Sequence, residues 1–297
     1  MKKKTFIFSL LAVCTLWSLQ AQTAFEDCKK IVGVGFHGGF ASMGDNTTAN
    51  NSPSGSIGVN ATFAYSITRS IAIKAGADFN FGRSFLRDKN ISTYTSEPIT
   101  ISNDIHGDMV RTTAVKYSFN SISEHYDVYY IGIPLQVVLQ GNAFDFSISQ
   151  FHQSFFSLGA KFALPIKFSG IGTTSPAQRF IGPDVEGTGV TLSEPVPAGT
   201  INGQSVEYDV KQYMGPSFMI MLMAEAGTML KTNEHGALTF SVFIEYSLLP
   251  TQMGSEQGML TFDNGKIVNN GYLASNLADK MRYFQGGVRL QYNFLLN

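Results

Sequence analysis

Three polar residues between positions 104 and 108 have the side chains of a metal site. Asp104, His106 and Asp108 alternate along the sequence, so in an extended backbone all three would lie on one face. Carboxylate and imidazole groups together can hold a divalent cation, which makes these residues weak candidates for metal binding. Polar connecting segments collect such residues by chance, however, and we expect neither a metal nor another cofactor.

A second run, Ser123-Glu124-His125, contains the residue types of a hydrolase: a nucleophile, an acid and a base. Neighbouring residues on a strand point to opposite faces, so Ser123 and His125 can share a face but Glu124 cannot join them. We therefore predict a protein that is not an enzyme and keep a hydrolase as the least favoured alternative.

The glycines of Gly33-Val34-Gly35-Phe36-His37-Gly38 match the spacing of a dinucleotide-binding loop. That loop needs a following helix, whose N-terminus receives the pyrophosphate. Here the glycines lie inside a segment of alternating polarity that is typical of a strand. The sequence therefore predicts no nucleotide binding.

A larger group of ionisable residues recurs at alternating positions of several distant segments. It comprises Lys74, Asp78, Lys161, Lys167, Glu225, Glu245 and Arg289, together with His37. Each shares its register with small or polar residues, among them many of the 29 glycines. What these groups can do depends on the elements that position them.

Eight segments of the chain alternate apolar and polar residues with the period of a β-strand. They are residues 31–41, 55–67, 70–83, 127–140, 154–168, 217–228, 237–249 and 282–296. Short and long connectors alternate strictly between them, as in barrels that have short periplasmic turns and long extracellular loops. The pattern predicts an all-β fold, an eight-stranded antiparallel transmembrane β-barrel.

Composition indicates which face of this barrel meets lipid. The chain is 44% hydrophobic and only 14% charged, and the apolar register of all eight segments carries no charge. Aromatic residues gather near both ends of that register, where rings meet the head-group layer. We therefore expect the apolar face to contact outer-membrane lipid and the ionisable group to form a charge network in the lumen. A soluble barrel would reverse the two faces.

Two prolines fall inside predicted strands. Pro134 and Pro165 each lack the N–H that a closed barrel would use, so we expect a bulge or a non-bonded position at both.

The N-terminus predicts export. Residues 1–21 resemble a signal peptide with three lysines before an apolar core, residues 22–30 would form a periplasmic tail, and 31–297 the barrel domain. With 21 basic and 22 acidic residues overall, the chain lacks the charge excess of a nucleic-acid-binding protein.

The run Tyr129-Tyr130-Ile131-Gly132-Ile133-Pro134-Leu135 resembles the Tyr-x-x-Ile-Pro-Leu segment of PorT-like outer-membrane barrel proteins. Gly132 departs from the acidic residue often found there. Small OmpA-type barrels are similar in architecture. The resemblance implies an eight-stranded barrel in the bacterial outer membrane and assigns no functional residue.

The long connectors 84–126, 169–216 and 251–281 are rich in polar residues, and loops on a rigid scaffold usually carry function. We therefore predict a structural or surface-interaction role, with an extracellular or envelope protein as partner through these loops. The alternative is a narrow, porin-like passive channel, in which the lumen charges would set ion selectivity.

Overall fold

The computed structural model describes residues 29–45, 50–68, 70–101, 109–141, 152–181, 196–203, 205–209, 218–249, 251–252, 259–263, 266–272 and 280–296. The predicted signal peptide, Cys28, and Asp104, His106 and Asp108 lie outside these ranges. Within them, there is no helix long and apolar enough to cross a membrane.

Eight antiparallel strands close into a ring in the order β1-β2-β3-β4-β5-β9-β10-β14, and β14 pairs back onto β1. Their bounds are β1 Lys30–Asp45, β2 Asn50–Ser66, β3 Ile71–Ile101, β4 Met109–Gly141, β5 His152–Thr174, β9 Met219–Asn233, β10 Gly236–Ser247 and β14 Lys280–Leu296. Closure removes every free edge from this part of the sheet. The predicted all-β barrel is confirmed, and each of its strands contains most of one alternating segment.

The alternation of the sequence becomes an apolar exterior and a polar interior. Val242 and Val288 are 59% and 63% exposed, whereas Ser241 and Arg289, their neighbours in sequence, are buried. An apolar face exposed all round a barrel is unfavourable in water and stable against lipid, and the closed ring leaves no strand edge unpaired there. The protein is therefore a β-barrel of the bacterial outer membrane.

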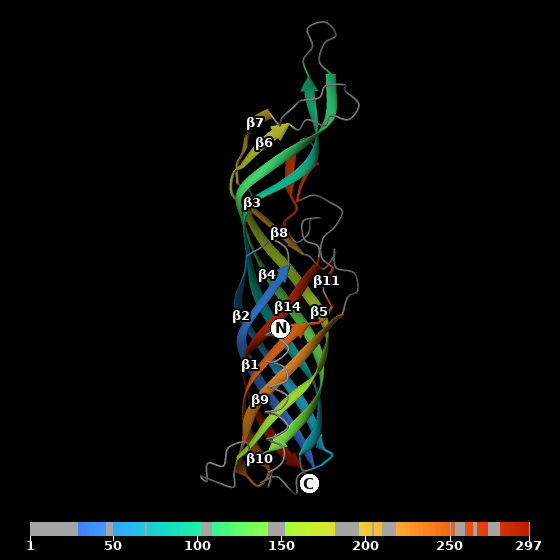
Figure 1. The fold of residues 1–297 in the computed structure, drawn as a ribbon, viewed down its shortest axis with the longest axis vertical. Helices are drawn as coiled ribbons and strands as arrows, with labels where there is room; N and C mark the ends of the chain where they lie inside the picture. The colour runs from blue at the N-terminus through green and yellow to red at the C-terminus, as the bar shows by residue number, and fades with distance from the viewer. Residues whose placement is uncertain are drawn as a thin grey trace, which may run out of the picture.

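Both described chain ends lie at one end of the barrel. Lys30 pairs with Leu296 there, and the turns at Ile67–Thr68 and Glu234–His235 are short (Figure 1). Short turns mark the periplasmic side of such barrels, and the opposite end faces outward. We call the two ends the periplasmic and the extracellular end.

Both prolines are accommodated as expected. The β3–β4 register is unchanged on either side of Pro134, but its pairing is interrupted at the proline and its neighbour. At Pro165 the β4–β5 register shifts by one residue, because Ile166 is inserted between Pro165 and Lys167. Such a bulge turns the following side chains over.

The bulge overturns the prediction for one charge. Lys167 is exposed outside the barrel, not in the lumen, and the next residue, Phe168, is buried inside. Lys167 pairs with Tyr129 near the extracellular end, where a lysine can extend its ammonium group toward water.

The predicted loop 84–126 is largely strand. β3 and β4 continue together well past the last β2–β3 pair at Arg87, and β4 then pairs with β6, Ala177–Ile181, which pairs with β7, Val196–Ile201 (Figure 1). We call the part of β3 after Arg87, the part of β4 before Ser123, β6 and β7 the projecting sheet. The loops 169–216 and 251–281 also contain β8 (Ser205–Asp209), β11 (Thr251–Gln252), β12 (Leu260–Asp263) and β13 (Lys266–Asn269).

Candidate functional site

Six charged side chains from five strands form one row across the barrel interior, in which cations and carboxylates alternate. In order, they are Lys74, Glu225, Arg289, Glu245, Lys161 and Asp78. Glu225 Oε2 lies 2.8 Å from Lys74 Nζ and 2.6 Å from Arg289 Nη1. One carboxylate oxygen therefore serves two cations, and we call the six residues the charge row.

The other half of the charge row is the more deeply buried. Lys161 Nζ lies 2.5 Å from Asp78 Oδ2 and 2.6 Å from Glu245 Oε1, and all three side chains are at most 1% exposed. Charges in such a place are tolerated only when they are paired. Three cations face three carboxylates, so the row is neutral as a whole.

The row contains every predicted lumen charge except Lys167. His37, the remaining member of the predicted network, lies in the interior but outside the row: its Nε2 bonds to Asn80 Oδ1, and its ring meets Phe243 edge to face. The structure thus places His37 as a packed interior group.

A layer of large side chains above the charge row was missed by the sequence analysis. Going toward the extracellular end, the interior is filled by buried residues of one apolar cluster, chiefly Met43, Leu86, Tyr126, Tyr130, Phe168, Met219, Met221 and Tyr283. Tyr130 and Met221 share their register with polar interior residues of the same strands, so the signal was present. It was obscured by the many glycines and charges of that register.

A small hairpin covers the extracellular end of this layer. β12 pairs with β13 and contacts β3, and Met259, Leu260 and Tyr272 are buried in the same cluster. The backbone N of Tyr272 donates to Glu124 Oε1 at 2.5 Å, and Tyr126 Oη donates to Glu124 Oε2 at 3.0 Å. Glu124 therefore ties the hairpin to the barrel.

This role of Glu124 bears on the hydrolase alternative. Its side chain is buried in the interior, whereas Ser123 and His125 are half-buried and belong to the opposite register. The His125 ring packs on Phe85. As the strand geometry predicts, the three residues do not converge. Among the described residues there is also no group of His, Cys, Asp and Glu that could hold a metal ion.

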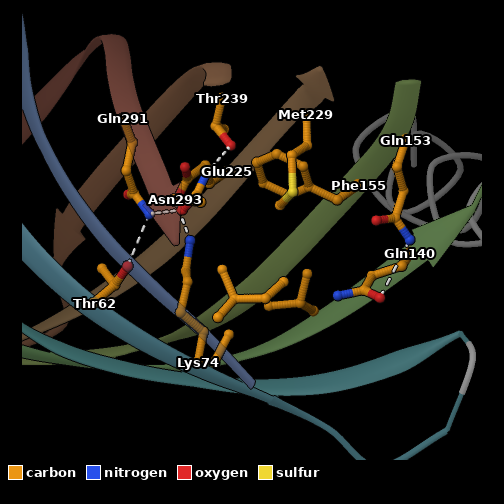
Figure 2. A pocket seen from close by; sticks show the side chains of 13 residues that line it. Thr62, Lys74, Gln140, Gln153, Phe155, Glu225, Met229, Thr239, Gln291 and Asn293 are labelled. Atoms are coloured by element: carbon orange, nitrogen blue, oxygen red, sulfur yellow. Dashed lines mark hydrogen bonds and ion pairs between the residues drawn. The ribbon is translucent and has the colours of Figure 1, made fainter. Parts of the chain in front are cut away.

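A cavity opens below the charge row, at the periplasmic end. It encloses about 500 Å³, including the solvent at its mouth, and Figure 2 shows the side chains that line it. Its polar wall contains Thr62, Lys74, Gln140, Gln153, Glu225, Thr239, Gln291 and Asn293, and its apolar wall Ile31, Ala64, Val138, Phe155 and Met229. Most of these residues lie within a few positions of the periplasmic strand ends.

The projecting sheet has an ion pair, and its buried residues continue the apolar cluster of the barrel interior. Arg179 Nη2 on β6 lies 2.7 Å from Glu97 Oε2 on β3, and Tyr117 Oη donates to Glu97 Oε1. Burial and the neighbouring carboxylate raise the pKa of Tyr117 above its usual range. Beside them Ile91 and Phe119 are buried, so this sheet is packed on one face.

No known family model matches the sequence, and no curated protein matches it. Among solved structures, the chain is similar to Ail, the attachment invasion locus protein of Yersinia pestis, at 10% identity and a TM-score of 0.30, over 91% of this chain and 99% of that one. Neisserial surface protein A gives 9% identity and a TM-score of 0.33, over 89% and 97%. OprG of Pseudomonas aeruginosa gives 11% identity and a TM-score of 0.37, over 93% of this chain and 100% of that one.

These three are small β-barrel proteins, two of them named for the cell surface or the outer membrane. At such identities and TM-scores, no residue role passes from them to this chain. Its placement in the membrane rests on its own apolar exterior and closed ring. The resemblance to PorT-like proteins stays a prediction, because no family model matches.

Proposed function

We propose that the protein is a non-enzymatic barrel that binds a partner outside the cell through its projecting sheet. The observation that carries this proposal is the packing of that sheet. Beyond Arg87, the chain continues as paired strands with buried Ile91, Tyr117 and Phe119 and the Glu97–Arg179 ion pair. Ordering this many residues is entropically costly, and a surface of fixed shape is what recognition of a partner requires.

The blocked interior supports an interaction role over a passive channel. A solute entering from outside would meet the β12–β13 hairpin, then the layer containing Tyr130 and Phe168, and then the charge row. In an eight-stranded barrel, the interior is only wide enough for side chains to fill. The charges of the row therefore have a structural role in this proposal, because each cation is paired with a carboxylate of the row.

Two measurements test the proposal together. The purified barrel should give no single-channel steps in planar bilayers, and steady steps that vanish in Lys161→Gln or Glu225→Gln would favour the channel. Photo-cross-linkers at Gln178 and Thr200, both exposed on the projecting sheet, should yield discrete adducts on intact cells.

A deletion variant and a control position complete the design. Replacing residues 90–120 with Asn-Gly keeps the Lys89–Ser121 pair and removes the projecting parts of β3 and β4. The deletion should remove the adducts and leave heat-modifiable gel migration intact. A cross-linker at Thr232, in β9 next to the periplasmic turn Glu234–His235, serves as the control. Adducts from Thr232 alone would contradict an outward partner.

A further inference from the structure

The charge row reaches the periplasmic cavity through two residues, its terminal cation Lys74 and the carboxylate of Glu225. Its first member, Lys74, is a cation on the cavity wall, and its last, Asp78, is a buried carboxylate further along β3. The Lys74 side chain is 10% exposed, more than any other in the row. Glu225, its carboxylate partner, is shared with Arg289 through the same oxygen. Lys74 thus has donor capacity left for an anion that enters the cavity.

A pair of amides lines the cavity across from Lys74 and supplies the second half of a binding site (Figure 2). Gln153 Nε2 donates to Gln140 Oε1 at 3.3 Å, which leaves the other amide atom of each residue available. Gln153 is 1% exposed, and its Oε1 has no hydrogen-bond partner among the described residues. In Figure 2 the Gln140 nitrogen points away from Gln153, into the space between the lining side chains. Burying an oxygen without a hydrogen-bond donor is unfavourable, so a ligand that supplies a donor is favoured.

The remaining polar residues of the cavity are already occupied. Gln291 Nε2 donates to Thr62 Oγ1 at 2.8 Å and to Asn293 Oδ1 at 2.6 Å, and Asn293 Nδ2 donates to Thr239 Oγ1 at 2.6 Å. The groups open to a ligand are therefore one cation, one amide donor and one amide acceptor. Ile31, Val138 and Met229 lie on the apolar wall.

We propose that this cavity binds the carboxyl-terminal end of a peptide from the periplasm. Lys74 binds the terminal carboxylate, Gln140 donates to the peptide C=O, and the peptide N–H donates to Gln153 Oε1. The apolar wall accommodates an aliphatic side chain. The site is independent of the projecting sheet and of its partner.

The test uses the full mature chain in detergent micelles and a tetrapeptide, Gly-Gly-Leu-Leu, labelled with fluorescein at its amino end. Fluorescence anisotropy should show saturable binding of the free-carboxylate peptide, and binding about tenfold or more weaker for the same peptide with an amidated end. The same four residues fused to the end of a small soluble protein form a second arm. Binding of the fused form extends the ligand to protein C-termini, and binding of the free peptide alone restricts it to short peptides; both support the proposal.

Substitutions of Lys74 and Gln153 test which side chains contact the peptide. Lys74→Gln should weaken binding of the free-carboxylate peptide about tenfold, so that this peptide no longer binds more tightly than the amidated one. Lys74→Arg should keep the affinity and the preference for the carboxylate. Gln153→Leu should weaken the binding of both peptides about fivefold. This variant also tests the site if Lys74→Gln fails to fold. Lys167→Gln, outside the barrel, should change nothing.

Three results would overturn the proposal: no saturable binding, equal binding of the carboxylate and amide peptides, or unchanged binding in both Lys74→Gln and Gln153→Leu. Binding that appears only after residues 22–28 are removed would also overturn it. The chain's own tail would then be the natural occupant of the cavity.

Discussion

Lys161 Nζ lies 2.6 Å from Glu245 Oε1 at the centre of the barrel, and neither side chain has any exposed surface. The two residues are 84 positions apart in sequence and meet only because the eight strands close. Asp78 contacts the same ammonium group, so this one lysine is paired with two carboxylates.

Lys161→Met is therefore expected to destabilise the barrel strongly. It leaves Asp78 and Glu245 buried with too little positive charge, which typically costs about 3–5 kcal/mol. Lys167→Met, the same substitution six residues along β5 at an exposed position, should stay within about 0.5 kcal/mol of the wild type. The urea midpoint, followed by the heat-modifiable gel band, measures both variants. Equal midpoints would mean that the charge row contributes nothing to stability.

Two adjacent glycines of β1 offer a matched test of strand packing. A Cβ at Gly39 would collide with the backbone carbonyl oxygen of Gly286 on β14, which cannot move without breaking the ladder. A Cβ at Gly38 would meet only the Ser56 carbonyl oxygen, at 3.7 Å. Gly39→Ala should cost about 1–3 kcal/mol, and Gly38→Ala should be neutral or slightly stabilising. The same gel assay compares them, and a larger loss in Gly38→Ala would contradict the pairing of β1 with β14.

The stability of the projecting sheet should fall at alkaline pH because of Tyr117. Its pKa is raised in the folded state by burial and by Glu97, so above about pH 10 the unfolded chain has released a proton that the folded chain retains. Stability then decreases as pH rises from the unfolded pKa toward the folded one, and is unaffected by this group below it. Protease resistance of residues 88–122 should fall as the pH rises above about 10 in the wild type, and less in Tyr117→Phe. An identical fall in the two proteins would exclude Tyr117 as the cause.

The sequence predicted the ring and most of its register because a strand that divides lipid from a polar interior must alternate. Lys74 and Asp78 are four residues apart in one uninterrupted stretch of β3, so the alternation alone places both inside. The same reasoning failed at Lys167, since the extra residue Ile166 turns the strand over. Pro165 suggested a bulge, but only the pairing with β4 shows which residue is inserted.

The projecting sheet was not predictable in the same way. Between Asp88 and Ile122 the chain is rich in Ser, Thr and Asn, a composition that resembles a loop. Its strands are stabilised by pairing with each other and with β6, and by buried residues such as Val115 and Tyr117. β-propensity depends strongly on such neighbours, which a single sequence does not reveal. The cavity glutamines Gln140 and Gln153 were missed for a similar reason, because they meet across a strand pair.

The orientation of the barrel gives the last prediction. In a Cys28→Ser background, cysteines at Gln178 and Thr200 should react with a membrane-impermeant maleimide on intact cells, since both positions are exposed on the projecting sheet. A cysteine at Thr232, equally exposed but next to a short turn, should react only after the outer membrane is permeabilised. The two ends of a closed barrel open to different compartments, so one labelling pattern fixes the direction of every strand. Labelling of Thr232→Cys on intact cells would mean that the barrel has the opposite orientation and that the Lys74 cavity opens outside the cell.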